Sequence, residues 1–327
     1  MRRRPGLRIL AALALALAAS PGTTADAAPA PGRRLAVTID DLPANPAGSV
    51  AKDPATQTAM TRKLLATLAA RSIPAVGFVN EGALDVPGET AAEREERIAV
   101  LRLWTDAGLE LGNHTYSHRS LNREPLDAFQ ADVVRGEAVT RALLAGSGKS
   151  LRYFRHPFLQ VGLELDKRRA FERFLAERGY TVAPVTVDND EWIFAAVYAD
   201  ALRRGDPAAA ERVANEYLAY MEQVFGFVEE VSRRLLGREL PQVLLIHANA
   251  LNADHLDALA ARIEARGYRY VTLEEALRDP AYSRPDDYVG AWGLSWLHHW
   301  EVTEGKKRSP SPDPAPWVRE AYQALSR

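Results

Sequence analysis

Seven short apolar runs, each followed by a longer amphipathic segment, constrain the fold of this chain more than any other feature. The runs cover residues 35–39, 75–79, 109–112, 151–154, 181–187, 242–247 and 268–273. The helical patterns cover residues 55–71, 90–107, 125–145, 166–178, 207–222, 224–236 and 253–266. Strands that alternate with helices form parallel sheets, because a parallel neighbour is reached through a crossover. The alternation predicts an α/β chain whose parallel sheet is closed, or nearly closed, into a barrel.

The first residues, MRRRPGLRILAALALALAASPGTTADA, combine a basic start, a short apolar stretch and a small-residue site ending at Ala27. This pattern predicts a secretory signal peptide over residues 1–27. The alternative is a membrane anchor, but the apolar stretch is shorter than the ~20 residues of a spanning helix. We therefore expect an exported chain, periplasmic or secreted, without stable membrane insertion once the signal is removed.

Composition narrows the choice of partners. The chain has no cysteine, so neither a disulfide framework nor a lipoprotein attachment site is available. Its formal net charge is −2, and loss of the predicted signal would make it more acidic. Nucleic acid and anionic membrane surfaces are therefore not expected partners. We expect one catalytic domain over residues 33–279, followed by a Trp- and Pro-rich extension over residues 280–327. The sequence does not predict an oligomeric state.

Polar side chains follow five of the seven runs at the point where each expected strand ends. They are Asp40 and Asp41, His114 and His118, Arg155, Asp188, and His247. In parallel barrels the carboxyl ends of the strands meet at one face, and the chemistry is concentrated there. We therefore expect these residues to form one site.

The stretch GNHTYSH places His114 and His118 four residues apart. On one turn of helix two such imidazoles face the same way, and a nearby carboxylate, here Asp41, completes a three-ligand divalent metal site. Surface histidines explain an isolated pair about as well, and a turn or helix cap explains the acidic pair alone. The two features together favour the metal site.

Three further residues have roles that follow from charge. Asp40 can point a different way from its neighbour and act as a general base toward water. Arg155 can hold that carboxylate ionised and oriented. His247 ends an apolar strand, where a nearby acid such as Asp188 would favour the protonated form that a general acid requires.

The ordered motifs TIDD, HTYSH, RHPF, DNDEW and LLIH resemble those of the polysaccharide deacetylases, the carbohydrate esterases of family four. The resemblance covers roughly residues 35–275 and implies a distorted seven-stranded parallel (β/α) barrel. It implies Asp40 as general base, Arg155 as its orienting partner and His247 as general acid. The metal ligands that it implies are Asp41, His114 and His118, and the groove-lining residues are Pro157, Phe158 and Trp192.

Two positions depart from the family pattern. Ile39 stands where an aromatic residue is common, and Glu191 stands where a second aspartate usually precedes the tryptophan. The second departure leaves open whether Asp188, Asp190 or Glu191 pairs with His247, and we favour Asp188.

The resemblance implies a metal-dependent hydrolase that removes acetyl groups, N-acetyl above all, from an acetylated glycan. Zinc is the expected ion, with cobalt, nickel or manganese as alternatives. An O-acetyl xylan esterase on the same fold is the nearest alternative function. Two histidines and one carboxylate also form the site of iron(II) oxygenases, but those enzymes need neither Asp40 nor His247. A non-catalytic sugar-binding relative is disfavoured because both of these positions retain titratable groups.

Trp292, Trp296 and Trp300 recur every four residues in the extension, so a helix over residues 291–300 is predicted to present all three along one side. Because tryptophans at helical spacing usually pack, we expect the stripe to dock the extension onto the barrel. The alternative is that one of the rings reaches the groove and stacks on a sugar. The proline-rich segment that follows, KKRSPSPDPAP, is expected to be extended.

Overall fold

A computed structural model describes residues 32–49 and 53–325, and the predicted signal peptide lies outside them. Every apolar run of the sequence contains a strand. The strands are β1 (Arg33–Leu42), β2 (Val76–Val79), β3 (Glu110–Asn113), β4 (Tyr153–Phe154), β5 (Thr181–Val182), β6 (Gln242–His247) and β7 (Tyr268–Tyr270).

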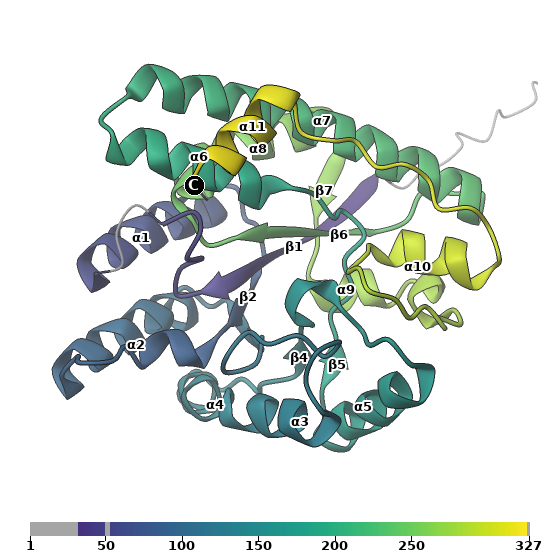
Figure 1. The fold of residues 1–327 in the computed structure, drawn as a ribbon, viewed down its shortest axis with the longest axis horizontal. Helices are drawn as coiled ribbons and strands as arrows, with labels where there is room; N and C mark the ends of the chain where they lie inside the picture. Colours follow the sequence, from purple (N-terminus) through teal and green to yellow (C-terminus); the bar gives the residue numbers. More distant parts are fainter. Residues whose placement is uncertain (1–31, 50–52, 326–327) are drawn as a thin grey trace, which may run out of the picture. The chain divides into compact units, whose positions relative to one another are not determined.

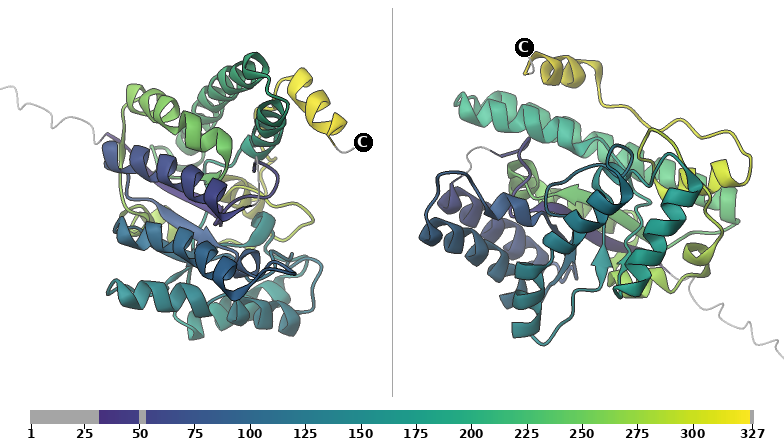
Figure 2. Two further views of the ribbon diagram at one scale, coloured as in Figure 1. Left: turned by 90° about the vertical axis from the view of Figure 1, so that its left-hand side faces the viewer. Right: turned by 60° about the horizontal axis from the view of Figure 1, so that its bottom comes forward.

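The helices lie around the strands (Figures 1 and 2). They are α1 (Pro54–Ala70), α2 (Ala91–Asp106), α3 (Leu126–Arg135), α4 (Ala138–Gly146), α5 (Leu165–Glu177), α6 (Glu191–Arg203), α7 (Pro207–Leu236), α8 (Ala250–Ala265), α9 (Leu273–Leu277), α10 (Trp296–Thr303) and α11 (Pro316–Ala324). Short 3₁₀ turns cover Glu81–Leu84, Pro157–Leu159 and Pro280–Ser283.

The strands form one parallel sheet in the order β5-β4-β3-β2-β1-β6, and β7 pairs with the first residues of β1. β1 lies between β2 and β6 near the middle of the fold (Figure 1). Beyond β5 the chain reaches the opposite edge, where Val187 bridges Leu244 of β6 and the Val187 N–H donates to the Val243 carbonyl (3.0 Å). These contacts curl the sheet toward closure, so the prediction of a distorted (β/α) barrel is confirmed.

Local sequence explains where several helices begin. The side chain of Asp53 accepts from the Thr56 N–H and caps α1, and Thr90 forms a capping box with Glu93 at the start of α2. Asn249 caps α8 by accepting from the Asn252 N–H at 3.0 Å. This last cap follows His247 by two residues and fixes the backbone that leaves the site.

The crossover before β6 differs from its prediction. Two helices were expected over residues 207–222 and 224–236, but α7 runs unbroken from Pro207 to Leu236. A glycine inside a helix costs about 1 kcal/mol relative to alanine. Gly226 is tolerated because the buried face of α7 packs against α6 and α8 along the length of the helix.

The helix predicted over residues 125–145 is also divided, into α3 and α4, with Gly136 between them. A Cβ atom at Gly136 would lie 2.5 Å from the backbone nitrogen of Tyr116. The break therefore lets the loop that carries His114 and His118 lie directly against the chain at Gly136.

The C-terminal extension packs on two helices of the barrel, with α10 against α7 and α11 against α6 (Figure 1). Ser295 caps α10 by accepting from the His298 N–H, so the helix begins only at Trp296. The predicted stripe of three tryptophans is therefore wrong: Trp296 and Trp300 are buried, but Trp292 precedes the helix and is 73% exposed. No helix among the described residues is long and apolar enough to cross a membrane.

Candidate metal centre and active site

The carboxyl ends of neighbouring strands bring the predicted site residues together. Asp40 of β1 is paired in register with His247 of β6, and the Ala248 N–H donates to the Asp40 carbonyl at 3.0 Å. β3 ends at Asn113, directly before His114, and β4 ends at Phe154, directly before Arg155. Residues far apart in the sequence thus meet because their strands are neighbours in one parallel sheet.

Asp41, His114 and His118 form a cluster of potential metal ligands at this end of the sheet. Their ligand atoms all lie within 4.8 Å of one another. Oδ1 of Asp41 is 3.6 Å from Nε2 of His114 and 3.5 Å from Nε2 of His118. Over residues 32–49 and 53–325, no other three histidine or acidic side chains converge in this way.

The two histidines converge by a different backbone path from the one predicted. No helical turn is formed, because Thr115 and His118 have positive φ values of 66° and 51°. The His118 N–H donates to Oγ1 of Thr115 at 3.0 Å, and this bond holds the loop. Asp41 also has a positive φ, of 63°. Such left-handed conformations at residues with side chains are costly, and they cluster at sites where the surrounding structure enforces them.

The chemistry of the three side chains fits a divalent cation. Nδ1 of His114 donates to the Arg155 carbonyl (2.9 Å), which leaves Nε2 with its lone pair toward the cluster. Burial, together with His118, lowers the pKa of His114 to about 3, so the ring is neutral. Oδ2 of Asp41 accepts from Asn45 (2.5 Å), while its buried Oδ1 has no hydrogen-bond partner among the described residues. An unpartnered carboxylate oxygen between two imidazole nitrogens is what a zinc-type site requires.

Burial opposes ionisation of Asp41, but the nearby histidines, His118 first, outweigh it and hold the pKa of this carboxyl below its usual value. Asp41 is therefore a carboxylate, as a metal ligand must be.

Asp40 lies beside this cluster but faces a different partner. Arg155 is fully buried, and its Nη1 is 3.4 Å from Oδ2 of Asp40. Burial raises the pKa of Asp40 to about 6, with Arg155 acting in the opposite direction. The guanidinium is itself fixed by bonds to Oγ1 of Thr38 (2.8 Å) and the Ala183 carbonyl (3.0 Å). Asp40 is therefore held in one orientation and can accept a proton near neutral pH.

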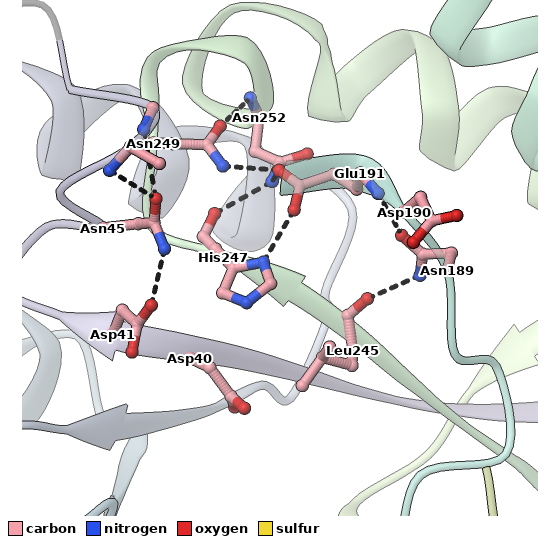
Figure 3. A network of polar contacts seen from close by, with 12 residues as sticks. Asp40, Asp41, Asn45, Asn189, Asp190, Glu191, Leu245, His247, Asn249 and Asn252 are labelled. Carbon is pink, nitrogen blue, oxygen red and sulfur yellow. Dashed lines mark hydrogen bonds and ion pairs between the residues drawn. The ribbon is translucent and has the colours of Figure 1, made fainter. Parts of the chain in front are cut away.

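His247 pairs with Glu191, so the favoured pairing with Asp188 is wrong. Figure 3 shows the ring of His247 between Glu191 of α6 and the two aspartates of β1. Its Nδ1 is 2.7 Å from Oε2 of the fully buried Glu191. Burial opposes protonation, yet the hydrogen bond and charge of Glu191 raise the pKa of His247 to about 9. The ring is therefore protonated at neutral pH, with Nε2 left to donate.

Two asparagines that sequence reasoning missed hold Glu191 in place. Asn249 and Asn252 both donate side-chain N–H groups to Oε1 of Glu191, the second at 2.6 Å. Asn252 also donates to the His247 carbonyl at 2.8 Å (Figure 3). They lie in the turn and first residues of α8, so the segment that follows His247 also fixes the acid beside it. Asparagines in a helix start gave no sign of this role.

Asp188 lies at the end of the run that closes the barrel and remains near the site. Burial, and then the neighbouring Asp190, raise the pKa of Asp188 to about 7. Its charge acts on Arg155 and His247 without forming the bond to the imidazole that Glu191 makes.

We predict that Glu191→Gln will shift the alkaline limb of the pH–rate profile from about 9 to lower pH. The amide removes the charge that raises the pKa of His247, while burial of the ring continues to favour the neutral form. The check is kcat/KM measured across pH for Glu191→Gln and for Asp188→Asn. An alkaline limb that moves in the Asp188 variant and stays in the Glu191 variant would return the pairing to Asp188.

The groove-lining residues implied by the resemblance are only partly brought to the site. Pro157 is buried, and Phe158 is 56% exposed with its ring 4.4 Å from that of His118. Phe158 has a φ of 57°, which turns its side chain out of the 3₁₀ turn around it. Trp192 instead packs edge-on against Tyr322 of α11, with ring centroids 5.1 Å apart. Trp192 is not among the residues that line the cavity next to Asp41 and His118.

A cavity of about 350 Å³ adjoins the ligand cluster. Asp41 and His118 form one wall, and the rest is formed by the loops after β1, β2 and β3, including Pro46, Asn80 and Tyr116. An acetyl group and part of a sugar ring would fit such a space. His118 therefore lines this cavity and also contacts the exposed ring of Phe158.

Comparisons with known proteins agree with the motifs. Residues 27–173 match the family model described as polysaccharide deacetylase. The fourth and fifth motifs lie beyond the matched residues. A search of curated proteins finds no match.

Several solved structures resemble the chain at low identity. One is a mutant, with restored enzymatic activity, of a CE4-family pseudoenzyme from Bacillus anthracis (17% identity, 76% of this chain and 69% of that chain covered, TM-score 0.46). Another is the Bc1960 peptidoglycan N-acetylglucosamine deacetylase (18%, 74% and 87%, TM-score 0.46). A third is a family 4 carbohydrate esterase from Streptomyces lividans (19%, 75% and 96%, TM-score 0.44). Likeness at this level does not decide function, and residues 27–173 of this chain are similar to the polysaccharide deacetylase family, whose model they match.

Proposed function

We propose that this protein is a metal-dependent hydrolase that removes acetyl groups, N-acetyl above all, from an extracytoplasmic polysaccharide or oligosaccharide. The observation that carries the proposal is the convergence of Asp41, His114 and His118 next to one fixed carboxylate and one protonated imidazole. The match to the polysaccharide deacetylase model supports the same class of substrate. The signal-like N-terminus supports the extracytoplasmic location.

The three ligands would hold one divalent ion, with zinc as the expected species. When bound, such an ion supplies Lewis acidity and lowers the pKa of water. Asp40, kept in place by Arg155, takes the proton of the attacking water. His247, protonated and held by Glu191, gives its Nε2 proton to the leaving nitrogen of the sugar. With an O-acetyl substrate the same proton goes to the leaving alcohol.

The environments of these two groups separate their roles. Asp40 has a pKa of about 6 and His247 a pKa of about 9. Between pH 6 and pH 9 Asp40 is therefore deprotonated and His247 is protonated. A pair of titratable groups whose environments push their pKa values apart is the usual basis for an acid–base assignment. This favours a working hydrolase over a sugar-binding relative.

The proposal is tested by acetate release from N-acetylglucosamine oligomers, peptidoglycan fragments and acetylated xylan, each with and without a chelator. We expect release that stops on chelation and returns when a divalent ion is added. His114→Ala should lose both the bound ion, measured by elemental analysis, and activity. His255→Ala is the matched control, because that histidine lies on α8 against Tyr198 and should leave both unchanged.

Two results would contradict the proposal. Full ion content in His114→Ala would refute the ligand assignment, and chelator-resistant release would refute the metal requirement. Equal loss in His255→Ala would show that the first variant acts through folding.

A further inference from the structure

Trp292 stands apart from the other tryptophans of the extension. Trp296 is packed against His299, with ring centroids 4.6 Å apart, and Trp300 against Tyr282 at 5.9 Å. Trp292 is 73% exposed. Among the described residues, no other large apolar side chain is exposed to a greater extent. An indole that leaves most of its surface in water loses the stabilisation that burial would provide, so packing does not explain it.

The segment that carries Trp292 is fastened to the loop that carries Phe158. The Gly290 N–H donates to the Gly162 carbonyl (3.1 Å), and the Gln160 side chain donates to the Ala291 carbonyl (3.0 Å). Asn122 links both sides, because it donates to the Gly290 carbonyl (2.9 Å) and accepts from the Gly162 N–H (2.9 Å).

The contact is closest one residue after the tryptophan. A Cβ atom at Gly293 would lie 1.7 Å from the carbonyl oxygen of Phe158, so only glycine fits there. The hydroxyl of Tyr288 also donates to the Trp292 carbonyl at 2.7 Å. The backbone of Trp292 is therefore held beside Phe158 by contacts on both sides, while its ring is left in solvent.

These two segments together carry an unusual share of the exposed apolar surface. Eight large apolar side chains among the described residues are exposed. Four of the eight lie in these two segments: Phe158, Leu163, Leu165 and Trp292. Exposed apolar surface gathered in one region commonly marks a binding site. Here the region adjoins the ligand cluster, because the ring centroids of Phe158 and His118 are 4.4 Å apart.

We propose that Trp292, together with Phe158, forms a stacking subsite for a sugar ring of the substrate beyond the one that is deacetylated. The inference rests on the proposed function and adds to it a contact with a second sugar of the same chain. The apolar faces of pyranose rings pack on aromatic rings, and a rigid indole does so at little cost in conformational entropy. One sugar would lie over the cavity beside Asp41 and His118, and the chain would continue past Phe158 to Trp292. The extension thus supplies part of the substrate surface while Trp296 and Trp300 anchor it.

The test compares Trp292→Ala with the wild-type protein on N-acetylglucosamine oligomers from the dimer to the hexamer. We expect KM for the hexamer to rise roughly 3- to 10-fold, the effect of losing one aromatic contact, with kcat and the dimer KM unchanged. Trp292→Phe should recover part of the hexamer affinity. Val302→Ala, which alters another exposed apolar side chain of the extension, should change neither substrate.

Binding of the same oligomers to these variants in the Asp40→Asn background, measured by calorimetry, separates this inference from the proposed function. If the wild-type protein releases no acetate but hexamer binding still depends on Trp292, the subsite stands and the proposed function fails. If acetate is released but Trp292→Ala changes all chain lengths equally, or none, the subsite is refuted. A wild-type dimer in sedimentation that Trp292→Ala converts to monomer would assign the exposed surface to self-association instead and also refute it.

Discussion

Asp40→Asn is expected to keep the divalent ion and to lose about 10²–10⁴-fold of the hydrolysis rate, the usual size of a general-base contribution. The amide has nearly the shape of the carboxylate and can still lie against Arg155, but it cannot take a proton from water. The three proposed ligands are untouched, so ion content should stay at the wild-type level. The measurement is kcat on one oligomer, together with elemental analysis of the same preparation.

The neighbouring aspartate provides the matched comparison. Asp41→Asn changes the same chemical group one residue away, and it should lose the ion because Asp41 offers the unpartnered oxygen of the cluster. Near-normal turnover in Asp40→Asn would assign the base to another residue. Loss of the ion in Asp40→Asn would instead make Asp40 part of the ion site.

The pH dependence of the wild-type protein follows from the same pair. Activity should rise as pH increases through about 6, where Asp40 loses its proton, and fall above about 9, where His247 loses its own. Asp40→Asn should remove the acidic limb from its residual activity and keep the alkaline one.

Truncation after Asp279 is expected to prevent stable folding. It would remove the fully buried Leu297 and Val318 and the 2%-exposed Trp300, and it would uncover the surfaces of α6 and α7 on which α11 and α10 lie. Burial of one such side chain contributes about 1.5–3 kcal/mol, and a whole domain is stable by only about 5–15 kcal/mol. A truncated chain should therefore bind hydrophobic dyes and lack a cooperative thermal transition.

A buried ion pair makes the same loss larger. Arg168 of α5 forms a two-pronged contact with Asp286 (3.0 and 2.7 Å), and His299 adds a further contact to that carboxylate (3.0 Å). Removing one partner of a buried pair costs about 3–5 kcal/mol.

Point variants keep the stability prediction open to refutation without the whole truncation. Trp300→Ala should cost about 3–5 kcal/mol, as is typical of large buried aromatic residues. The exposed Val302→Ala should change stability by no more than about 0.5 kcal/mol. A truncated protein with an unchanged melting temperature would mean that the extension only rests on the barrel.

The sequence predicted the barrel well, because short apolar runs that alternate with amphipathic segments can be recognised from neighbouring residues alone. It predicted that Asp41, His114 and His118 would meet, since strand ends in a parallel sheet share one edge. It gave the wrong path for the histidines: four-residue spacing suits a helical turn, but Thr115 and His118 have left-handed backbone conformations, in a loop that lies directly against Gly136.

The pairing of His247 with Glu191 could not be predicted from the sequence, because it depends on which carboxylate lies within hydrogen-bond distance of the imidazole. Glu191 is the first residue of α6, and only the orientation of that helix decides whether its carboxylate or that of Asp188 meets the ring. The separation of Trp292 from Trp296 was missed for a related reason. Periodicity assigned both to one helix, whereas the Ser295 cap starts the helix after Trp292.

Arg155 has two roles, one through its backbone and one through its side chain. Its carbonyl fixes the ring of His114, and its guanidinium orients Asp40. A substitution at this position keeps a backbone carbonyl for the first contact but removes the guanidinium that makes the second. Under the proposed function, a substitution here would spare the three proposed ion ligands and remove the group that orients the proposed base. In evolutionary terms, under the proposed function, a change at this one position would separate ion binding from turnover.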